Sequence, residues 1–354
     1  SSWGGTPAQA WLSLEALRQE PPLAAQLAKW DEALAQHRKV LAQPEIAAAY
    51  QAELKHWQKE IAPAFNAAMK AYNTHKTGPK PSPAKPEPAN PDPMGLPSPS
   101  MRPSTPSVIY NTMIAPIATF GIRGALWYQG EANGSGGLEY RALLPRLIGD
   151  WRARWGQGDL PFLVVQLPGW DFDPKPTFKH QWPWLREAQA LTAKNVANTG
   201  LAVTIDLGDP KEVHPKGKLD VALRLILLAE KMAYGAKVVC QGPTFRELRL
   251  DGPVARVSFT DVGSGLTLGQ APWRAEGVEP FPTDKLVGFT IAGEDRIWYD
   301  AGAQIEGDSV VLSHPAVIQP VAVRYGWANA PRCNLYNKEG LPAAPFRSDD
   351  WAPP

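Results

Sequence analysis

The chain has few cysteines, little net charge and no long apolar run, and each of these shortages excludes a class of protein. Its 354 residues contain only Cys240 and Cys333, too few for a disulfide framework, although the two could pair if the fold brings them together. The formal net charge of +1 suggests neither a nucleic acid nor a strongly anionic surface as a partner. No apolar run reaches the roughly 18 residues that a membrane-spanning helix needs, so we expect no membrane partner.

Motifs for metal, nucleotide and serine catalysis are also missing. The chain has no His-Glu-x-x-His, P-loop or Cys-x-x-Cys pattern, so we expect neither a metal ion nor any other cofactor. It also lacks the Gly-x-Ser-x-Gly turn that presents a nucleophile in many hydrolases. Ser135 and Ser264 each follow a glycine directly, but neither has a glycine two positions before it. No nucleophile can therefore be named within the chain.

The first third of the chain is rich in alanine and then in proline. Residues 12–76 show apolar side chains at helical spacing, and Pro44 separates two such runs, which predicts an inserted helical hairpin. Residues 77–107 form a Pro/Lys/Ser tract that cannot build a core and favours extended conformations, as expected of a linker.

The remaining two thirds change texture once, near residue 237. From 108 to 236 apolar strands alternate with helices, which predicts an α/β core around a parallel sheet. After 237, short alternating segments are separated by Gly, Asp and Pro, which predicts a sandwich-like antiparallel β region over 237–354. The expected core strands are 124–129, 161–167 and 201–207, and the expected helices are 138–155, 184–194 and 216–234.

The polar turn after the first of these strands is one candidate site. Residues 125–128 are apolar, as expected of a strand covered on both faces, and Gly130 then allows a sharp turn. Gln129, Glu131 and Asn133 gather at the carboxyl end of the strand, where ligands bind in parallel α/β sheets. The same pattern also fits an ordinary strand-to-helix loop, and the Asn-Gly-Ser run that begins at Asn133 also fits a glycosylation sequon.

A second candidate site is the loop around His214. Of the six histidines, only His214 follows directly on an expected core strand with acidic residues nearby. A neutral imidazole can take a proton from a hydroxyl near pH 7, and a neighbouring carboxylate can hold its tautomer and stabilise its cation. Asp209 and Glu212 precede it in the same loop, and either could be that carboxylate. Asp209 also fits a loop or cap residue, and His214 also fits a structural histidine.

Several blocks of the sequence resemble those of a known family. The run that contains Trp127-Tyr128-Gln129-Gly130-Glu131 is similar to the third signature block of the SGNH-hydrolase superfamily, and more closely to that of the sialate O-acetylesterases. The Trp3-Gly4-Gly5 run resembles the second block of that family. The resembling blocks, which occur in the family's order, are 1–11, 122–133, 206–209 with 214–215, 324–327 and 334–337.

This resemblance implies an SGNH-hydrolase-like α/β fold and an oxyanion hole. Residues 1–11 would begin the SGNH core, which 108–236 would complete. The backbone N–H of Gly5 and the side-chain amide of Asn133 would donate to the oxyanion. Gln129 and Glu131 would touch the substrate or hold the loop. A plain glycine turn remains the alternative for Gly5.

The resemblance also assigns the acid and base of a catalytic triad. His214 would be the base, and Asp209 matches the aspartate that sialate O-acetylesterases place in this loop. Glu212 is the second choice. The wider superfamily has its aspartate three positions before the histidine, where this chain has Lys211.

The nucleophile is the main departure from the family's pattern. In the family the serine lies upstream of the Trp-Gly-Gly block, in a Gly-Gln-Ser-Asn motif, and this chain begins at the Trp-Gly-Gly block. The resemblance therefore predicts that a missing N-terminal segment or a partner chain supplies the serine and that this chain alone is inactive. An incomplete sheet leaves an edge and apolar surface uncovered, so we expect the isolated chain to be poorly soluble or to need a partner.

The favoured hypothesis is a carbohydrate O-acetyl esterase that resembles the sialate O-acetylesterases. Its substrate would be an acetylated carbohydrate, and its location would be extracellular or periplasmic, as the resemblance implies. Two alternatives stay open. The first is an acetylxylan-type polysaccharide acetylesterase, and the second is a non-catalytic carbohydrate-binding or structural fragment.

Overall fold

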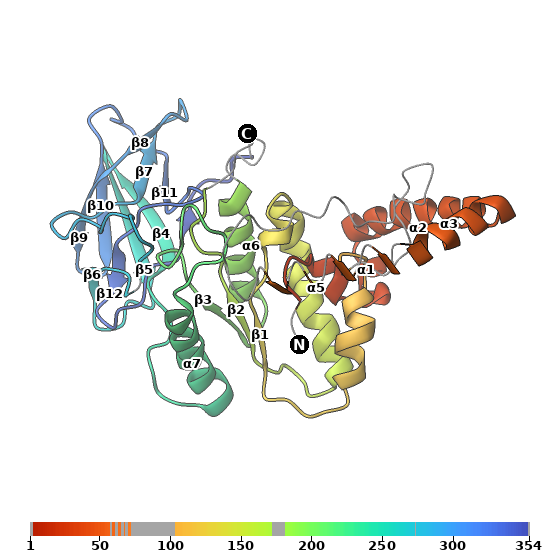
Figure 1. Cartoon of the computed structure of the whole chain (residues 1–354). Helices are drawn as coiled ribbons and strands as arrows, with labels where there is room; N and C mark the ends of the chain where they lie inside the picture. Colours follow the sequence, from red (N-terminus) through yellow and green to blue (C-terminus); the bar gives the residue numbers. More distant parts are fainter. Residues whose placement is uncertain are drawn as a thin grey trace.

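The computed structural model describes residues 3–56, 103–171, 181–272 and 274–352, together with 59–60, 63–64, 67 and 70–71. An α/β core lies in the middle of the molecule and a β-rich region adjoins it at one end, while helices α2 (Pro21–Leu41) and α3 (Pro44–His56) extend from the other (Figure 1). Most of the Pro-rich linker predicted over 77–107 lies outside the described residues.

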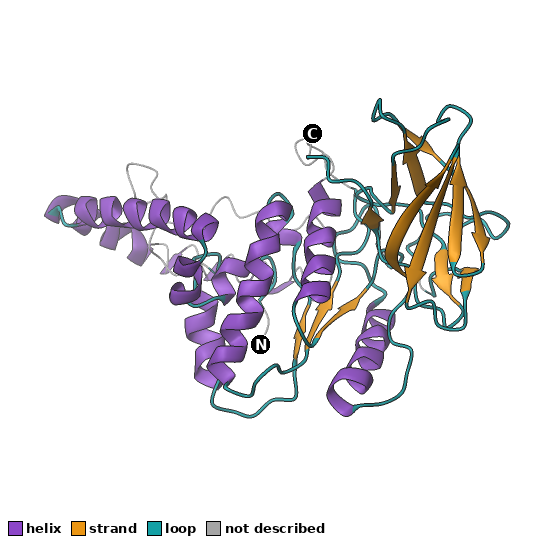
Figure 2. Cartoon of the chain, turned by 180° about the vertical axis from the view of Figure 1, so that it is seen from behind, coloured by secondary structure: helices purple, strands orange, loops and turns teal. Residues whose placement is uncertain are grey.

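The core sheet is parallel and has helices on both faces (Figure 2). Its strands lie in the order β1-β2-β3. Phe162 and Val164 of β2 pack with α5 and α6 on one face, whereas Leu163 packs with Leu228 of α7 on the other. The predicted α/β fold is therefore confirmed. The strands are β1 (Ala125–Trp127), β2 (Phe162–Val165) and β3 (Thr199–Ala202), and the helices are α5 (Gly137–Trp155), α6 (Gln181–Asn195) and α7 (Lys218–Tyr234).

Strand β1 is an exposed edge of this sheet. It pairs with β2 only, with Leu126 opposite Leu163, and no other described strand pairs with it. Leu163 is buried beneath α7, but Leu126 on the same face is 65% exposed. The expectation that residues 125–128 are covered on both faces is therefore wrong for Leu126. Helix α7 packs against β2 and β3 and leaves the β1 side of that face open.

Strand β3 begins and ends earlier than the sequence predicted. The apolar run 201–207 suggested the strand, but β3 ends at Ala202, which pairs with Val165 at the end of β2. The chain then turns, and the Leu207 N–H donates to the carbonyl of Thr204. The predicted end of α7 is correct. Gly235 follows the last residue of the helix with a φ of 74°, a conformation that favours glycine.

The N-terminal segment is helical where the sequence predicted a hairpin. Ser13 caps helix α1 (Leu14–Gln19), since its side chain accepts the Ala16 N–H. Pro44, which separates the two apolar runs, is the first residue of α3. Helices α2 and α3 extend away from the body of the molecule in both views (Figures 1 and 2).

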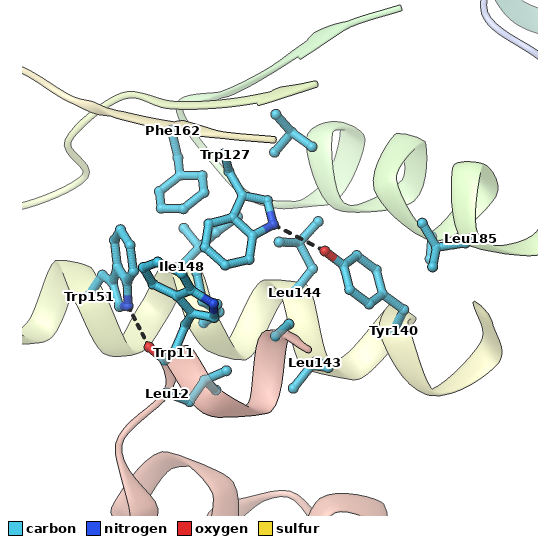
Figure 3. Close-up of a cluster of buried hydrophobic side chains, with 14 of the residues drawn as sticks. Trp11, Leu12, Trp127, Tyr140, Leu143, Leu144, Ile148, Trp151, Phe162 and Leu185 are labelled. Atoms are coloured by element: carbon cyan, nitrogen blue, oxygen red, sulfur yellow. Dashed lines mark hydrogen bonds between the residues drawn. The ribbon is translucent and has the colours of Figure 1, made fainter. Parts of the chain in front are cut away.

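An aromatic cluster fixes the short turn η1 (Ala8–Trp11) against the core sheet (Figure 3). Trp127 of β1 packs edge-on against Trp11 and Trp151, with ring centroids 5.8 Å apart in each pair. The Trp151 indole also donates to the carbonyl of Trp11 at 3.0 Å. Because aromatic pairs add about 0.5–1.5 kcal/mol to area burial, this cluster firmly joins the N-terminal block to β1.

The C-terminal region is antiparallel, as predicted, and its two four-stranded sheets enclose a second apolar core. Val310 pairs with Val257 across the centre of one sheet, and both side chains are fully buried. The first sheet contains β4 (Thr244–Asp251), β5 (Val254–Thr260), β10 (Ser309–Ser313) and β9 (Gly302–Glu306). The second contains β13 (Phe346–Arg347), β11 (Ala322–Tyr325), β7 (Phe289–Ala292) and β8 (Trp298–Asp300), and β12 (Leu335–Asn337) pairs with β6 (Leu266–Leu268).

Charged side chains join this region to the core. Arg347 donates to Glu187 of α6 at 2.6 Å, and its guanidinium lies over the ring of Trp184. Asp349 accepts from both Arg347 and Arg324, and these two arginines hold the pKa of its carboxyl below its usual value. The β region therefore has a defined position against α6.

The structure also shows whether the two cysteines pair and whether a described helix could cross a membrane. Cys240 and Cys333 are both buried free thiols, so the pairing that the sequence left open does not occur. Among the described helices, none combines the length and the apolar character that crossing a membrane requires.

Candidate active site

Gln129 lies at the centre of a buried hydrogen-bond network at the carboxyl end of β1. Its Nε2 donates to the carbonyl of Thr6 at 3.1 Å and to Oδ1 of Asn133 at 2.7 Å. Its Oε1 accepts the Tyr140 hydroxyl at 2.7 Å, and that hydroxyl accepts the Trp127 indole N–H at 3.0 Å. Every polar atom of the Gln129 side chain therefore has a partner within the protein, and this geometry supports a loop-holding role.

Asn133 ends the short turn η5 (Glu131–Asn133) and contacts the N-terminal block directly. Its Oδ1 accepts the backbone N–H of Ala8 at 2.8 Å, and its Nδ2 donates to Oε1 of Gln9 at 3.0 Å. With the hydrogen bond from Gln129 to Oδ1, three hydrogen bonds hold this buried amide in place. Two segments about 125 residues apart in sequence thus meet at this amide.

Gly5 lies at the tip of a turn in the N-terminal block. Its φ of 71° is in the left-handed region, which is strained for residues with a side chain. The Thr6 hydroxyl donates to the carbonyl of Trp3 at 2.8 Å and accepts the Trp11 indole N–H at 2.9 Å. Gly5 is exposed, whereas the next residue, Thr6, is buried, and its carbonyl accepts a hydrogen bond from the Gln129 side chain.

The loop that carries His214 has a buried root. Asp206 lies just beyond β3, and both of its carboxylate oxygens accept from Arg224 of α7 at 2.6 Å. The Tyr336 hydroxyl of β12 donates to the same carboxylate at 2.8 Å. These three groups, from the core and from the β region, fix the point at which the loop leaves the sheet.

Glu212, and not Asp209, is the acid that contacts His214. The Glu212 Oε1 lies 3.2 Å from Nδ1 of His214 and accepts the His214 backbone N–H at 2.9 Å. That backbone N–H lowers the pKa of the Glu212 carboxyl. Asp209 instead accepts the backbone N–H of Lys211 at 2.9 Å, and no hydrogen bond or ion pair joins it to His214 in the described part of the chain.

The loop tip is open to solvent. The side chain of His214 is 80% exposed and that of Glu212 is 52% exposed. An ion pair between such exposed groups contributes at most about 1 kcal/mol. The Glu212 contact therefore orients the imidazole, leaving Nε2 free for a ligand, but holds it only weakly.

Lys218 and Tyr128 bring the two candidate loops together. Lys218 is the first residue of α7, four positions after His214, and its Nζ lies 3.4 Å from the Tyr128 hydroxyl and 4.7 Å from the centre of its ring. Glu131 follows Tyr128 by three residues, and the charges of His214 and Lys218 act to lower the pKa of its carboxyl. Burial outweighs them and raises the pKa of Glu131. The Lys218–Tyr128 contact therefore brings the start of α7, four residues after His214, to the carboxyl end of β1.

Sequence reasoning missed several side chains that build this site. Tyr140 and Gln189 are buried polar residues on helices, and Gln189 donates to the carbonyls of Gln129 and Val165. The sequence could have revealed both residues, because each places a polar group among the apolar positions of a predicted helix. Lys218 had no signal, because its contact with Tyr128 joins residues 90 positions apart. No group of three or more metal-ligating side chains occurs among the described residues.

Comparisons with known proteins point to one family. The family model for carbohydrate esterases described as sialic acid-specific acetylesterases matches residues 99–233. Human sialate O-acetylesterase is 30% identical over 271 residues, which are 69% of this chain and 49% of that protein. The mouse protein is also 30% identical, over 277 residues that make up 70% of this chain and 49% of its own length.

A solved structure agrees with these relatives. A carbohydrate acetylesterase from Xanthomonas citri matches with a TM-score of 0.64 and 40% sequence identity, over 70% of this chain and 55% of that one. The chain spans about half the length of the curated relatives it matches, at 49% of the human protein. The matched residues include η5, the Asp206 root and His214, and the chain belongs to the sialate O-acetylesterase family of carbohydrate esterases.

Proposed function

We propose that this chain supplies the base and the oxyanion donors of a carbohydrate O-acetyl esterase. The observation that carries the proposal is the meeting of three segments at one end of the sheet. Asn133 is hydrogen-bonded to the N-terminal block, and the Lys218–Tyr128 contact brings the His214 loop to the same turn. The names of the relatives, sialate O-acetylesterase and carbohydrate acetylesterase, support an acetylated carbohydrate as the substrate.

The reaction would proceed by acyl transfer in two steps. His214 Nε2 takes the proton of a serine hydroxyl as its oxygen attacks the acetyl carbon, and the carbonyl oxygen becomes an oxyanion. The side-chain amide of Asn133 and the backbone N–H of Gly5 would donate to that oxyanion, and one such donor is worth about 3–4 kcal/mol. His214 then protonates the leaving sugar oxygen, and water repeats the sequence on the acetyl-enzyme.

Glu212 supports this cycle from the other side of the imidazole ring. It accepts from Nδ1, so the proton on Nδ1 is held there and Nε2 keeps its lone pair. Glu212 is therefore the orienting acid that this geometry favours over Asp209. Asp209 would act one step further away, by shaping the loop through the Lys211 N–H.

The serine would come from a polypeptide segment or partner chain outside these 354 residues. Among the described residues, no serine hydroxyl is hydrogen-bonded to His214. The open edge of β1 and the exposed side chain of Leu126 offer a place for an added strand and its covering helix. Leu219, Leu223 and Ile226 form an exposed apolar stripe on the neighbouring helix α7, with the spacing that a packed helix uses. The extracellular or periplasmic location remains a prediction.

The test is an acetyl-release assay on the complete protein and on this chain alone. The complete protein should hydrolyse an aryl acetate and release acetate from O-acetylated sialic acid, and the chain alone should be inactive. His214→Ala in the complete protein should lower kcat by more than about 10³-fold. The matched control is His314→Ala, because His314 stacks on Tyr299 in the β region. Full activity in His214→Ala would refute the assigned base.

The same assay separates the two alternatives. Preference for acetylated xylan over acetylated sialic acid would identify a polysaccharide acetylesterase that uses the same residues. Glycan binding by the complete protein without acetate release would identify a non-catalytic carbohydrate-binding protein.

A further inference from the structure

A small cavity lies at the junction of the α/β core and the β region. Its volume is about 60 Å³, which is enough for a few water molecules or for one small substituent of a sugar. Its walls are mainly apolar and few polar groups reach it, as is typical of ligand sites. The loop after β2, the His214 loop and two segments of the β region line it, through Gly169, Gly208, Pro210, Arg274, Phe281 and Arg332.

The core side of this cavity is part of the His214 loop. Pro210 lines the cavity and lies four residues before His214, and four residues of extended chain span at most about 14 Å. Asp206, whose carboxylate is bound by Arg224, lines the same side. The cavity is therefore near enough to His214 for one carbohydrate molecule to reach both.

Close backbone packing fixes this side of the cavity. A Cβ on Gly208 would lie 2.2 Å from the carbonyl oxygen of Gly169, so only glycine allows the two loops to approach this closely. The Asp171 N–H also donates to the carbonyl of Pro210 at 3.1 Å. The His214 loop is therefore held against the loop after β2 at the edge of the cavity.

The β region contributes a fixed arginine and an aromatic ring. The guanidinium carbon of Arg332 lies 5.9 Å from the centre of the Phe281 ring, and the guanidinium donates to the carbonyl of Pro280 at 2.8 Å. The Gln270 side chain accepts the Phe281 N–H and donates to the Phe281 carbonyl. These contacts hold Arg332 and the ring in place at the cavity.

The charged groups at the cavity leave one positive charge in excess. Arg274 and Arg332 are the two cations of its lining, and Glu279 is its exposed carboxylate. Asp206 is already paired with Arg224 through both oxygens. Within the described part of the chain, no ion pair joins either lining arginine to an acidic side chain. An excess of one charge suits a monoanion, and a guanidinium binds a carboxylate through two parallel hydrogen bonds.

We propose that this cavity binds the carboxylate of an acidic sugar and thereby selects acidic carbohydrates for the candidate site. Arg274 and Arg332 hold the carboxylate, while the acetyl ester of the same molecule lies at His214. Carboxylate binding does not depend on hydrolysis, but selection among substrates rests on the proposed esterase function. The cavity also separates the two substrate classes named above, because an acetylated chain of xylose units carries no carboxylate.

The first test is isothermal titration calorimetry of the complete protein with N-acetylneuraminic acid and with its methyl ester. The two ligands share one sugar, but the ester lacks the negative charge, so it should bind at least about tenfold more weakly. The affinity for the acid should also fall as salt is added, because salt screens the attraction. Equal affinities for the two ligands, or no binding of the acid, would overturn the proposal.

The second test assigns the binding to the two arginines. Arg274→Gln and Arg332→Gln should each weaken binding of the acid about fivefold or more and leave binding of the ester unchanged. Arg332→Lys keeps the charge but not the planar guanidinium, so it should restore part of the affinity. The matched control is Arg249→Gln, which removes an exposed arginine of the β region that is paired with Glu247.

Arg274 is exposed, so Arg274→Gln should fold normally and decides the question if Arg332→Gln does not fold. An undiminished preference for the acid in the folded variants would place the carboxylate elsewhere and overturn the assignment.

The kinetic test measures acetate release by the complete protein. With O-acetylated sialic acid, Arg274→Gln should raise KM about fivefold or more with little change in kcat, because it removes binding that is common to the ground state and the transition state. Hydrolysis of an aryl acetate, which has no carboxylate, should be unchanged. An unchanged KM for the acidic sugar would refute the selection. If the complete protein hydrolyses no acetyl ester, the proposed function fails, but the calorimetry still decides whether the cavity binds a carboxylate.

Discussion

The two sides of the candidate site are constructed in opposite ways. The Asn133 side is buried and over-determined. Gln129 and Asn133 hydrogen-bond to each other and to backbone atoms of the N-terminal block, and the Tyr140 hydroxyl donates to Gln129. The His214 side has a buried root at Asp206 but an exposed tip, where Glu212 is the only described side chain hydrogen-bonded to the imidazole. In the proposed function, the oxyanion donor is therefore held rigidly by the fold, whereas the base is held only weakly.

We expect the largest loss of stability from a substitution at the root of the His214 loop, where Arg224 binds Asp206. Arg224→Met leaves the buried Asp206 carboxylate without its main partner, so it should lower the free energy of unfolding by about 3–5 kcal/mol. Chemical denaturation followed by tryptophan fluorescence measures this change. Arg249→Met is the control, because its ion pair with Glu247 is on the surface and should contribute at most about 1 kcal/mol. Equal effects of the two substitutions would show that the loop root is not a buried anchor.

The buried network on the Asn133 side should give the next largest effect. Tyr140→Phe leaves the Trp127 indole N–H and Oε1 of Gln129 unpaired, at a cost of about 1–3 kcal/mol. Denaturation measures the loss, and Tyr234→Phe is the matched control because Tyr234 is an exposed tyrosine at the end of α7. A loss no larger than that of the control would mean that water replaces the hydroxyl and that the network is less rigid than the contacts indicate.

The open edge of β1 provides a third test, in which the same substitution is made in two polypeptides. Leu126→Ala should change the stability of this chain by less than about 0.5 kcal/mol, since the side chain is already exposed. In the complete protein it should cost about 1.5 kcal/mol if an added segment covers Leu126. Thermal melts of both polypeptides measure the difference. A sharp cooperative melt of the isolated chain, together with equal small effects in both, would argue against a covering segment.

The smallest predicted effect is the pH dependence that Glu131 introduces. Burial raises the pKa of Glu131, so the folded chain keeps this proton at pH values where the unfolded chain has lost it. Stability should therefore fall as pH rises from about 4.3, the ordinary glutamate value, through the raised pKa of the folded state, and then level off. Glu131→Gln removes this cost, so its stability relative to wild type should increase over that range, by less than about 1 kcal/mol.

Denaturation at a series of pH values measures this difference, and Glu276→Gln should show no such trend. A variant whose relative stability decreases with rising pH would mean that Glu131 is stabilised as a carboxylate in the fold. That result would reverse the sign of the burial argument.

Much of the fold could be predicted from local patterns. The apolar runs located β1 and β2, and Gly235 located the end of α7, because these features depend on residues that are neighbours in sequence. The end of β3 was missed, since strand length is set by the partner strand and not by the apolar run itself. The exposure of Leu126 was missed for a similar reason, because apolar character does not show whether a covering helix is present.

The site was predicted less completely than the fold. Blocks of sequence pointed to Gly5, Asn133 and His214, but spacing alone could not rank Asp209 above or below Glu212. The structure distinguishes these two acids because loop geometry turns the Glu212 side chain toward Nδ1 and the Asp209 side chain toward a backbone N–H. The contact between Lys218 and Tyr128 has no sequence signal, since it depends on how α7 packs beside β1.

The sequence by itself determined the chemistry that this chain can supply: one loop imidazole, the amide of Asn133 beside a glycine turn, and no recognisable nucleophile. Only the tertiary structure decided which of these groups meet. Hydrogen bonds such as that from Ala8 to Asn133 join residues far apart along the chain, and the packing of strands and helices, rather than local propensity, brings them within 3 Å. The screening at the loop tip likewise depends on burial, which is a property of the folded surface.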